Sequence, residues 1–121
     1  MLINVSNHPH DKWQERQIKE AQAIFGTIID YPFPQIDTKA TSESIDRQAE
    51  VFAATILAKD LNAAVLIQGE YIFTYRLVNI LKCFGICCVA AESARQVEEY
   101  TDEMGNSVKK SVFQFEKFLC Y

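Results

Sequence analysis

A hydroxyl, an amide and an imidazole group lie together near the start of this chain. Ser6, Asn7 and His8 follow an apolar segment and come just before Pro9. Such groups can hydrogen-bond a small anion, and an imidazole can also exchange a proton near neutral pH. This run therefore predicts one wall of a site for a small anionic ligand.

Two further runs of this kind occur later in the sequence. Gly69 would let a ligand approach the backbone closely, and a helix that starts at Glu70 would offer its first N–H groups to a phosphate, with Thr74 one turn further on. Ser93 and Arg95 follow another apolar segment, and a guanidinium can grip a phosphate through two hydrogen bonds. We therefore predict one ligand site that is built from all three runs.

The polar residues of these runs also have structural interpretations, which the sequence leaves open. Ser6 and Asn7 would cap the turn that follows them, and His8 would be an exposed loop residue. Glu70 would be a carboxylate that the dipole of the following helix favours. Under this interpretation none of these four side chains would touch a ligand.

The arginine and the large aromatic residues near the runs have similar alternatives. Arg95 would form an ion pair with Glu98 or Glu99 on the same segment. Trp13 and Tyr71 are expected in the core rather than as platforms on which a ligand stacks. The prediction of a site therefore depends on the convergence of the three runs, and not on any single residue.

Apolar periodicity predicts strands that alternate with helices. The strands are expected at 2–6, 27–31, 63–68 and 86–91, and the helices at about 11–25, 41–61 and 70–84. Because such alternation gives parallel βαβ units, we expect an α/β fold with a Rossmann-like open sheet of four parallel strands, in the order 2-1-3-4, and helices on both faces. The three polar runs would then lie at one sheet edge, with a crevice between the first and third strands.

The C-terminal part departs from this alternation. Residues 95–101 and 108–118 alternate in polarity and flank a turn-rich segment at 102–107. These segments are predicted to form an antiparallel β-hairpin. The side chains expected on its packed face are Val97, Phe113 and Phe115.

Length, charge and hydropathy exclude several classes of protein. The 121 residues suit a single domain, 1–121, and the net charge of −4 argues against a broad surface for DNA or long RNA. No apolar run is long enough to cross a bilayer, and the first residues lack the pattern of a secretory signal. A cytoplasmic protein without DNA or membrane partners is therefore expected.

The sequence gives no support for a metal or an organic cofactor. Its four cysteines, at positions 83, 87, 88 and 120, contain no C-x-x-C pair, and both histidines lie far from them. Reduced and mostly buried thiols are expected instead. Neither a P-loop nor a dinucleotide-binding glycine fingerprint occurs, so no cofactor is predicted.

Taken together, the short motifs resemble those of a known group of proteins. They are Asn7-His8-Pro9 followed by Trp13 and Gln17, then Asp30 with Pro32-Phe33-Pro34, Gly69-Glu70 with Phe73-Thr74, Ser93 with Arg95, and a tail with Phe113 and Phe115. Over nearly the whole chain this pattern is similar to small, single-domain, CARF-like (CRISPR-associated Rossmann fold) proteins of the ring-nuclease type, which accompany type III CRISPR systems.

The resemblance implies a homodimer with a shared pocket at the carboxyl edge of the sheet. This pocket would bind a cyclic oligoadenylate, with cyclic tetra-adenylate expected, and cleave it without a metal, which would switch off the CRISPR signal. A ribose 2′-hydroxyl would attack the adjacent phosphorus and leave a 2′,3′-cyclic phosphate. His8 would be the general acid or base, while Asn7, Thr74 and Arg95 would stabilise the developing charge.

Two other functions remain open at this point. A binding module with the same fold would sequester or sense the ring without cutting it, and it would use the same gripping residues. A protein–protein adaptor with a flavodoxin-like fold would bind no nucleotide at all. Incubation with cyclic tetra-adenylate distinguishes the three functions, because the nuclease would cleave the ring, the binding module would bind it intact, and the adaptor would not bind it.

Overall fold

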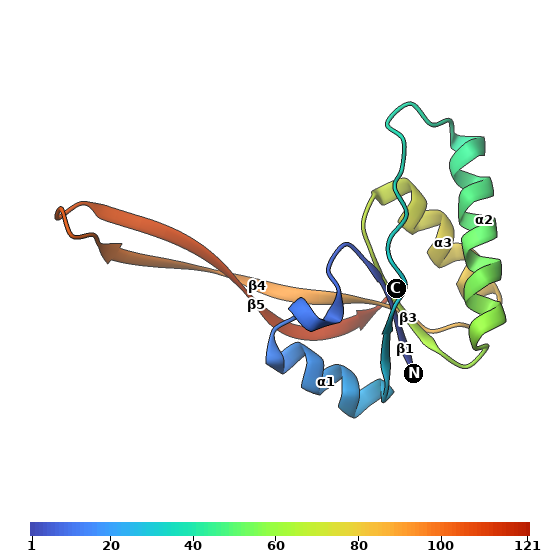
Figure 1. The fold of residues 1–121 in the computed structure, drawn as a ribbon, viewed down its shortest axis with the longest axis horizontal. Coiled ribbons are helices and arrows are strands. Elements are labelled where there is room, and N and C mark those ends of the chain that lie inside the picture. The colour runs from blue at the N-terminus through green and yellow to red at the C-terminus, as the bar shows by residue number, and fades with distance from the viewer.

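A computed structural model describes all residues, 1–121, as an α/β fold built on one mixed five-stranded sheet (Figure 1). The strand order is β2-β1-β3-β4-β5, so the predicted order of the first four strands is confirmed. β1, β2, β3 and the start of β4 are parallel, whereas β5 is antiparallel to β4. The strands are β1 (Leu2–Ser6), β2 (Ile28–Asp30), β3 (Ala64–Gln68), β4 (Cys88–Thr101) and β5 (Ser107–Cys120).

The predicted C-terminal antiparallel hairpin is confirmed, but the prediction of an open sheet of four parallel strands is wrong, since the sheet is mixed and has five strands. β4 does not end near Ala91 but continues to Thr101, so one strand serves both as the fourth parallel strand and as the first arm of the hairpin. The register shifts once, between Glu92 and Ser93, and the shift leaves Glu116 of β5 without a partner. A bulge of this kind bends and twists a strand without ending it, which explains why no turn forms here.

Three α-helices and one 3-10 helix cover the sheet. α1 lies on one face, and α2 and α3 lie on the other, as predicted (Figure 1). The predicted helix from Asp11 is split, because the backbone of Trp13 and Gln14 is extended between the two pieces. The helices are η1 (His10–Lys12), α1 (Glu15–Phe25), α2 (Ser42–Lys59) and α3 (Tyr71–Cys83). None of them is both long enough and apolar enough to cross a membrane.

The core has two layers, one on each face of the sheet. In β1, Ile3 and Val5 pack against α2 and α3, while Leu2 faces Ala21 of α1. Alternate strand residues point to opposite faces, and here both faces are covered, as is usual for parallel strands. Cys88 is the one buried cysteine, so the expectation that the thiols are mostly buried is wrong.

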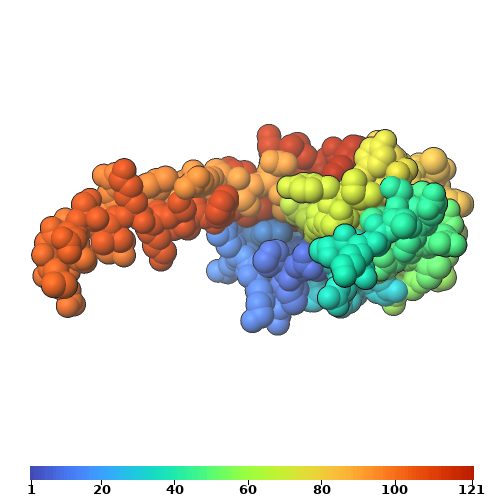
Figure 2. Space-filling model, turned by 90° about the horizontal axis from the view of Figure 1, so that it is seen from above, coloured from blue at the N-terminus to red at the C-terminus, as the bar shows by residue number.

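Beyond the body of the molecule, β4 and β5 continue as a two-stranded ribbon (Figure 1). We call residues 95–113 of this ribbon the arm, and Figure 2 shows that it curves along its length. Val97 and Phe113 were expected on a packed face, but they are 57% and 61% exposed. Phe115, in contrast, is buried, because it lies where the ribbon meets α1 and packs against Phe118.

Candidate functional site

A cavity of about 430 Å³ opens at the carboxyl ends of β1 and β3, on the face that carries α1. We call it the polar cavity, since most of its lining side chains are polar. The lining residues are Ser6, Asn7, His8, Lys12, Trp13, Gln14, Gln17, Leu66, Gln68, Gly69, Ala91, Ser93 and Phe115. Of the three predicted polar runs, the first is thus present in full, together with Gly69 and Ser93.

Ser6 is largely occupied by internal hydrogen bonds. Its hydroxyl donates to Asn4 Oδ1 at 2.8 Å and accepts from the His8 N–H at 3.2 Å. Asn4 in turn donates from Nδ2 to the His8 carbonyl and to Asp30 Oδ1, at 2.9 and 2.8 Å. The structural interpretation of Ser6 as a turn cap is therefore confirmed, although its side chain still faces the cavity.

The loop after β1 is fixed by a further set of contacts around Asp30. The His10 N–H donates to Asp30 Oδ1 at 3.0 Å, and His10 Nδ1 lies 2.9 Å from Asp30 Oδ2. Burial acts to raise the pKa of the Asp30 carboxyl, but the hydrogen bonds from Asn4 and His10 outweigh burial and hold that pKa below its usual value. Trp13 Nε1 also donates to the His8 carbonyl, at 3.0 Å. The backbone that presents Asn7 and His8 is therefore well supported.

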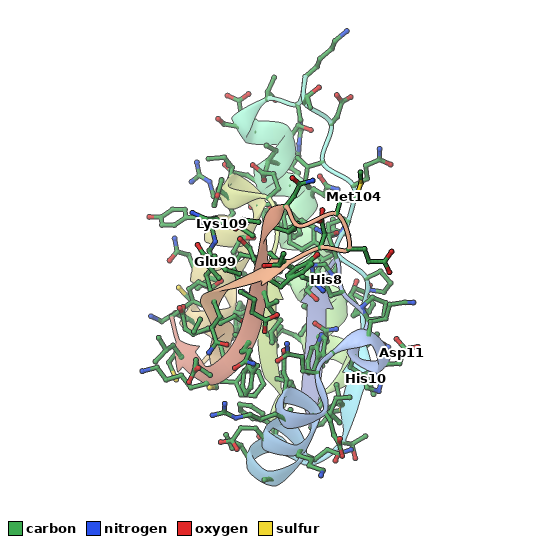
Figure 3. The ribbon with its side chains drawn as sticks, turned by 90° about the vertical axis from the view of Figure 1, so that its left-hand side faces the viewer. His8, His10, Asp11, Glu99, Met104 and Lys109 are labelled. Atoms are coloured by element: carbon green, nitrogen blue, oxygen red, sulfur yellow. The ribbon has the colours of Figure 1, made fainter.

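The side chains of Asn7 and His8 themselves have no hydrogen-bond partner in the chain, and both residues are exposed. Figure 3 shows His8 near the histidine and aspartate of η1, His10 and Asp11. Lys12, also in η1, is the one lysine or arginine that lines the polar cavity. An amide, an imidazole and an ammonium group are thus free to meet a ligand there.

The amino end of α3 does not offer its N–H groups to a ligand. Glu70 accepts hydrogen bonds from the N–H groups of Ile72 and Phe73, at 3.0 and 2.7 Å. Its observed role is that of a helix cap, as the structural interpretation expected. Because these donors are already satisfied, the phosphate site that we predicted at this helix terminus is not formed as expected.

The lack of a side chain at Gly69 allows a neighbouring ring to pack closely, in addition to the close approach of a ligand that was predicted. A Cβ atom at this position would collide with the ring of Phe33, which lies against Gly69 and stacks edge to face on Phe73 at 5.2 Å. Phe33 belongs to the Pro-Phe-Pro segment after β2. Any side chain at position 69 would therefore displace this ring.

Arg95 does not line the polar cavity. It lies on the arm, where Nε and Nη2 donate to Ser111 Oγ on β5 at 3.2 and 2.9 Å. The expected ion pair with Glu98 or Glu99 is also absent, since Glu99 contacts Lys109 at 3.4 Å (Figure 3). β4 continues where a turn was expected, and this continuation carries Arg95 away from the site.

Two glutamines at the cavity hydrogen-bond the hairpin through their side-chain amides, in or next to its root, by which we mean residues 88–94 and 114–120. Gln14 donates to the Phe113 carbonyl at 2.7 Å and accepts from the Phe115 N–H at 2.9 Å. Gln68 donates to the carbonyl of Ala91 and accepts from its N–H, both at 3.1 Å. Each side-chain amide therefore makes the pair of hydrogen bonds that the backbone of a neighbouring strand would otherwise make.

Sequence reasoning missed the roles of these two residues. Gln14 was counted as part of the predicted helix at 11–25, and Gln68 stands at the end of an apolar run, so neither stood out. The partners of Gln14 are about 100 positions away in sequence. Lys12 was missed because it was counted as part of a helix.

A second cavity, of about 470 Å³, lies on the α3 side of the same sheet edge. Thr74 lines this cavity and not the polar one, while Gln68 and Gly69 line both. The remaining lining side chains are those of Tyr71, Tyr75, Val78 and Tyr121, and we call this space the aromatic cavity. Tyr71 was expected in the core, but it is 87% exposed.

The titratable groups do not gather into a metal site. No three His, Cys, Asp or Glu side chains lie close enough together to hold an ion. Burial and the neighbouring Cys87 thiol raise the pKa of Cys88 to about 11, so this thiol is protonated at neutral pH.

Comparison with known proteins gives one match. Residues 1–119 match the model of the family described as "Uncharacterized protein MJ1673 family". No curated protein and no solved structure matches the chain. The match covers nearly the whole chain and therefore establishes the family to which the chain belongs.

Proposed function

The chain belongs to the uncharacterized MJ1673 family, and we propose that it binds a cyclic oligoadenylate in the polar cavity. Cyclic tetra-adenylate is the ligand that we favour. One observation carries this proposal: Asn7, His8 and Lys12 present free polar groups to a cavity at the carboxyl ends of β1 and β3. In open α/β sheets this edge, at the point where the strand order reverses, is the usual place for a ligand.

The lining of the cavity suits a sugar–phosphate chain. Lys12 would supply a charge for a phosphate, while Asn7 and Ser93 would bond its oxygens or the ribose hydroxyls. The chain as a whole carries a net charge of −4, so a cation at the cavity would favour a small anion without creating a general surface for nucleic acid.

The size of the cavity favours a homodimer. A volume of about 430 Å³ fits a single drug-sized ligand, and a ring of four nucleotides is larger than that. We propose that two copies meet around a two-fold axis, so that each polar cavity holds half of the ring. The arm, which has no buried side chain, would supply surface for such an association.

We further propose that the ring is cleaved by its own 2′-hydroxyl. His8 would take the proton from this hydroxyl as the O2′–P bond forms and the P–O5′ bond breaks, and the leaving 5′-oxygen would be protonated. Asn7 and Lys12 would stabilise the charge on the phosphate, so that Lys12 replaces Arg95 in this role. The product would be a linear adenylate with a 2′,3′-cyclic phosphate, formed by in-line attack.

A specific observation favours the alternative of a binding protein that does not cleave. The His8 imidazole makes no hydrogen bond, so no second group fixes its orientation or tautomer. Catalytic histidines are usually oriented by such a partner. The displacement of Arg95 removes a second group that the cleavage reaction was expected to use.

A single experiment separates these functions. The protein is incubated with cyclic tetra-adenylate in EDTA, binding is measured by calorimetry, and the products are identified by mass spectrometry. Cleavage that is lost in His8→Ala with binding retained would support the nuclease. Tight binding with an intact ring would support the binding protein, and no binding would exclude both.

Asp11→Ala is the matched control for His8→Ala. Both residues are exposed and lie in the segment after β1, but Asp11 does not line the polar cavity and makes no contact that fixes the loop. We therefore expect Asp11→Ala to retain cleavage. Equal loss in both variants would show that the effect comes from the fold of the segment.

A further inference from the structure

The aromatic cavity carries three tyrosine rings that stack on no other aromatic ring of the chain. Tyr71 and Tyr75 are one turn apart on α3, so their side chains lie on the same face of the helix. They are 87% and 63% exposed. Large aromatic side chains in such positions are typical of binding surfaces, where one face of the ring meets a ligand.

The third ring, that of Tyr121, is held in place. Its hydroxyl donates to the Ile67 carbonyl at 2.5 Å, and its N–H donates to the carbonyl of Cys88 at 3.0 Å. Lys82 Nζ also donates to the Tyr121 carbonyl, at 3.0 Å. Burial, together with the neighbouring Cys88 and Glu92, raises the pKa of the Tyr121 hydroxyl, so it remains a neutral donor. The ring therefore forms a fixed wall of the cavity.

A buried hydroxyl in the same cavity lacks a partner. Thr74 Oγ1 is inaccessible to solvent and makes no hydrogen bond. Buried polar atoms are nearly always paired, and an unpaired one is unfavourable until a ligand or water satisfies it. This hydroxyl gives the cavity a polar group next to its aromatic walls.

The two cavities meet at the end of β3. Gln68 and Gly69 line both of them, so the two cavities share this part of their walls, and the ring of Phe33 lies where a side chain at position 69 would stand. The polar cavity has the groups for phosphate and ribose, whereas the aromatic cavity has the groups for a planar ring. A nucleotide contains both a planar base and a ribose with its phosphate, joined by covalent bonds.

We infer that the aromatic cavity receives a purine base of the bound ligand. The base stacks on Tyr71 and Tyr75, and its edge hydrogen-bonds Thr74 Oγ1, while the attached ribose and phosphate pass Gly69 into the polar cavity. This inference rests on the proposed function and assigns the part of the site that recognises the base. Stacking on aromatic side chains is a common way in which proteins hold unpaired bases.

The test measures the affinity for cyclic tetra-adenylate by calorimetry in EDTA. We expect Tyr71→Ala and Tyr75→Ala each to weaken binding about 5- to 150-fold, the range that corresponds to loss of one stacked base. Tyr71→Phe and Tyr75→Phe keep the ring and should bind as the unsubstituted protein does. Phe84→Ala removes an exposed aromatic ring that lines neither cavity and lies outside the arm, so it controls for a general loss of aromatic surface.

A second measurement does not depend on any variant. With a base stacked on the two tyrosines, the methyl resonance of Thr74 should shift on addition of cyclic tetra-adenylate, because the ring current of the base acts on it. Normal affinity in both alanine variants and an unmoved Thr74 methyl would overturn the inference. If Asn7→Ala weakened binding in that case, the proposed function would still stand, whereas no binding by the unsubstituted protein would overturn both.

Discussion

The root and the arm of the β4–β5 hairpin share one continuous ladder of backbone pairs, but they differ in what their side chains touch. In the root, Val89 and Phe115 are buried, and Phe118 stacks on Phe25 of α1 at 5.6 Å. In the arm, Val97 and Phe113 point into solvent. The same secondary structure is therefore part of the core at one end and has no core at the other.

The difference shows that strand pairing and burial are separate contributions to stability. An isolated two-stranded hairpin is marginal in water, because its hydrogen bonds replace bonds to water at little net gain. The root adds apolar burial and the amide contacts of Gln14 with Phe115 and of Gln68 with Ala91. Apart from the hydrogen bond of its last residue, Phe113, to Gln14, the arm adds contacts between its own side chains, such as Arg95 with Ser111.

The largest expected effect of this difference is on amide hydrogen exchange. Root amides should open only with the whole protein, at a free energy of about 5–15 kcal/mol, whereas arm amides should open locally at a free energy close to zero. The measurement is residue-resolved exchange at low protein concentration. Arm protection that rises with concentration would instead show that a second copy covers the arm.

Loss of a root side chain should be the next largest effect. Phe115→Ala should lower the free energy of unfolding by about 3–5 kcal/mol, because it leaves a void between β5 and α1. Phe113→Ala, two residues away and exposed, should change it by less than about 0.5 kcal/mol. Urea unfolding of both variants tests this pair, and equal effects would contradict the comparison.

A smaller effect is expected from the amide contact of Gln14. Gln14→Ala removes two hydrogen bonds to β5 and should cost about 1–2 kcal/mol of stability. Gln17→Ala is the matched control, since Gln17 lines the same cavity and makes no hydrogen bond to the hairpin. If the two variants unfolded at the same urea concentration, Gln14 would have no special role at the root.

The smallest effect is expected for the ion pair on the arm. Glu99 and Lys109 are both well exposed, and their contact of 3.4 Å is long. Lys109→Ala should therefore change the free energy of unfolding by at most about 0.5 kcal/mol, at low and at high salt alike. A larger, salt-dependent loss would indicate that the arm is more ordered than its lack of packing suggests.

Elements with uninterrupted apolar patterns were predicted well from the sequence. β1 and β3 lie within one residue of the predicted strands, and α3 lies within one residue of its predicted range. The residues of β1 and β3 are buried on both faces of the sheet, so the apolar pattern from which they were predicted is the one that folding imposes. The order of these strands was predicted from that of doubly wound folds made of parallel βαβ units, and not from particular residues.

The misses have a common physical cause, which is contact between segments distant in the sequence. The bulge in the β4–β5 pair depends on pairing with Lys117 and Phe115, so nothing local revealed that β4 would continue past Ala91. Asn4 looked like an ordinary polar residue of a strand, although it is buried and holds Asp30. The loop at Ser6–His8 was predicted as part of the site because the end of β1 can be recognised from the change between neighbouring apolar and polar residues.

The side chain of Gln68 has a consequence for the dimensions of the site. Backbone pairing of β3 with β4 stops at Leu66 and Val89, and beyond it the amide of Gln68 spans the distance to Ala91. The separation of the two strands at this edge is therefore set by the length of one side chain. We therefore expect a shorter amide such as asparagine either to lose these two hydrogen bonds or to draw the strands together, at a position that lines both cavities.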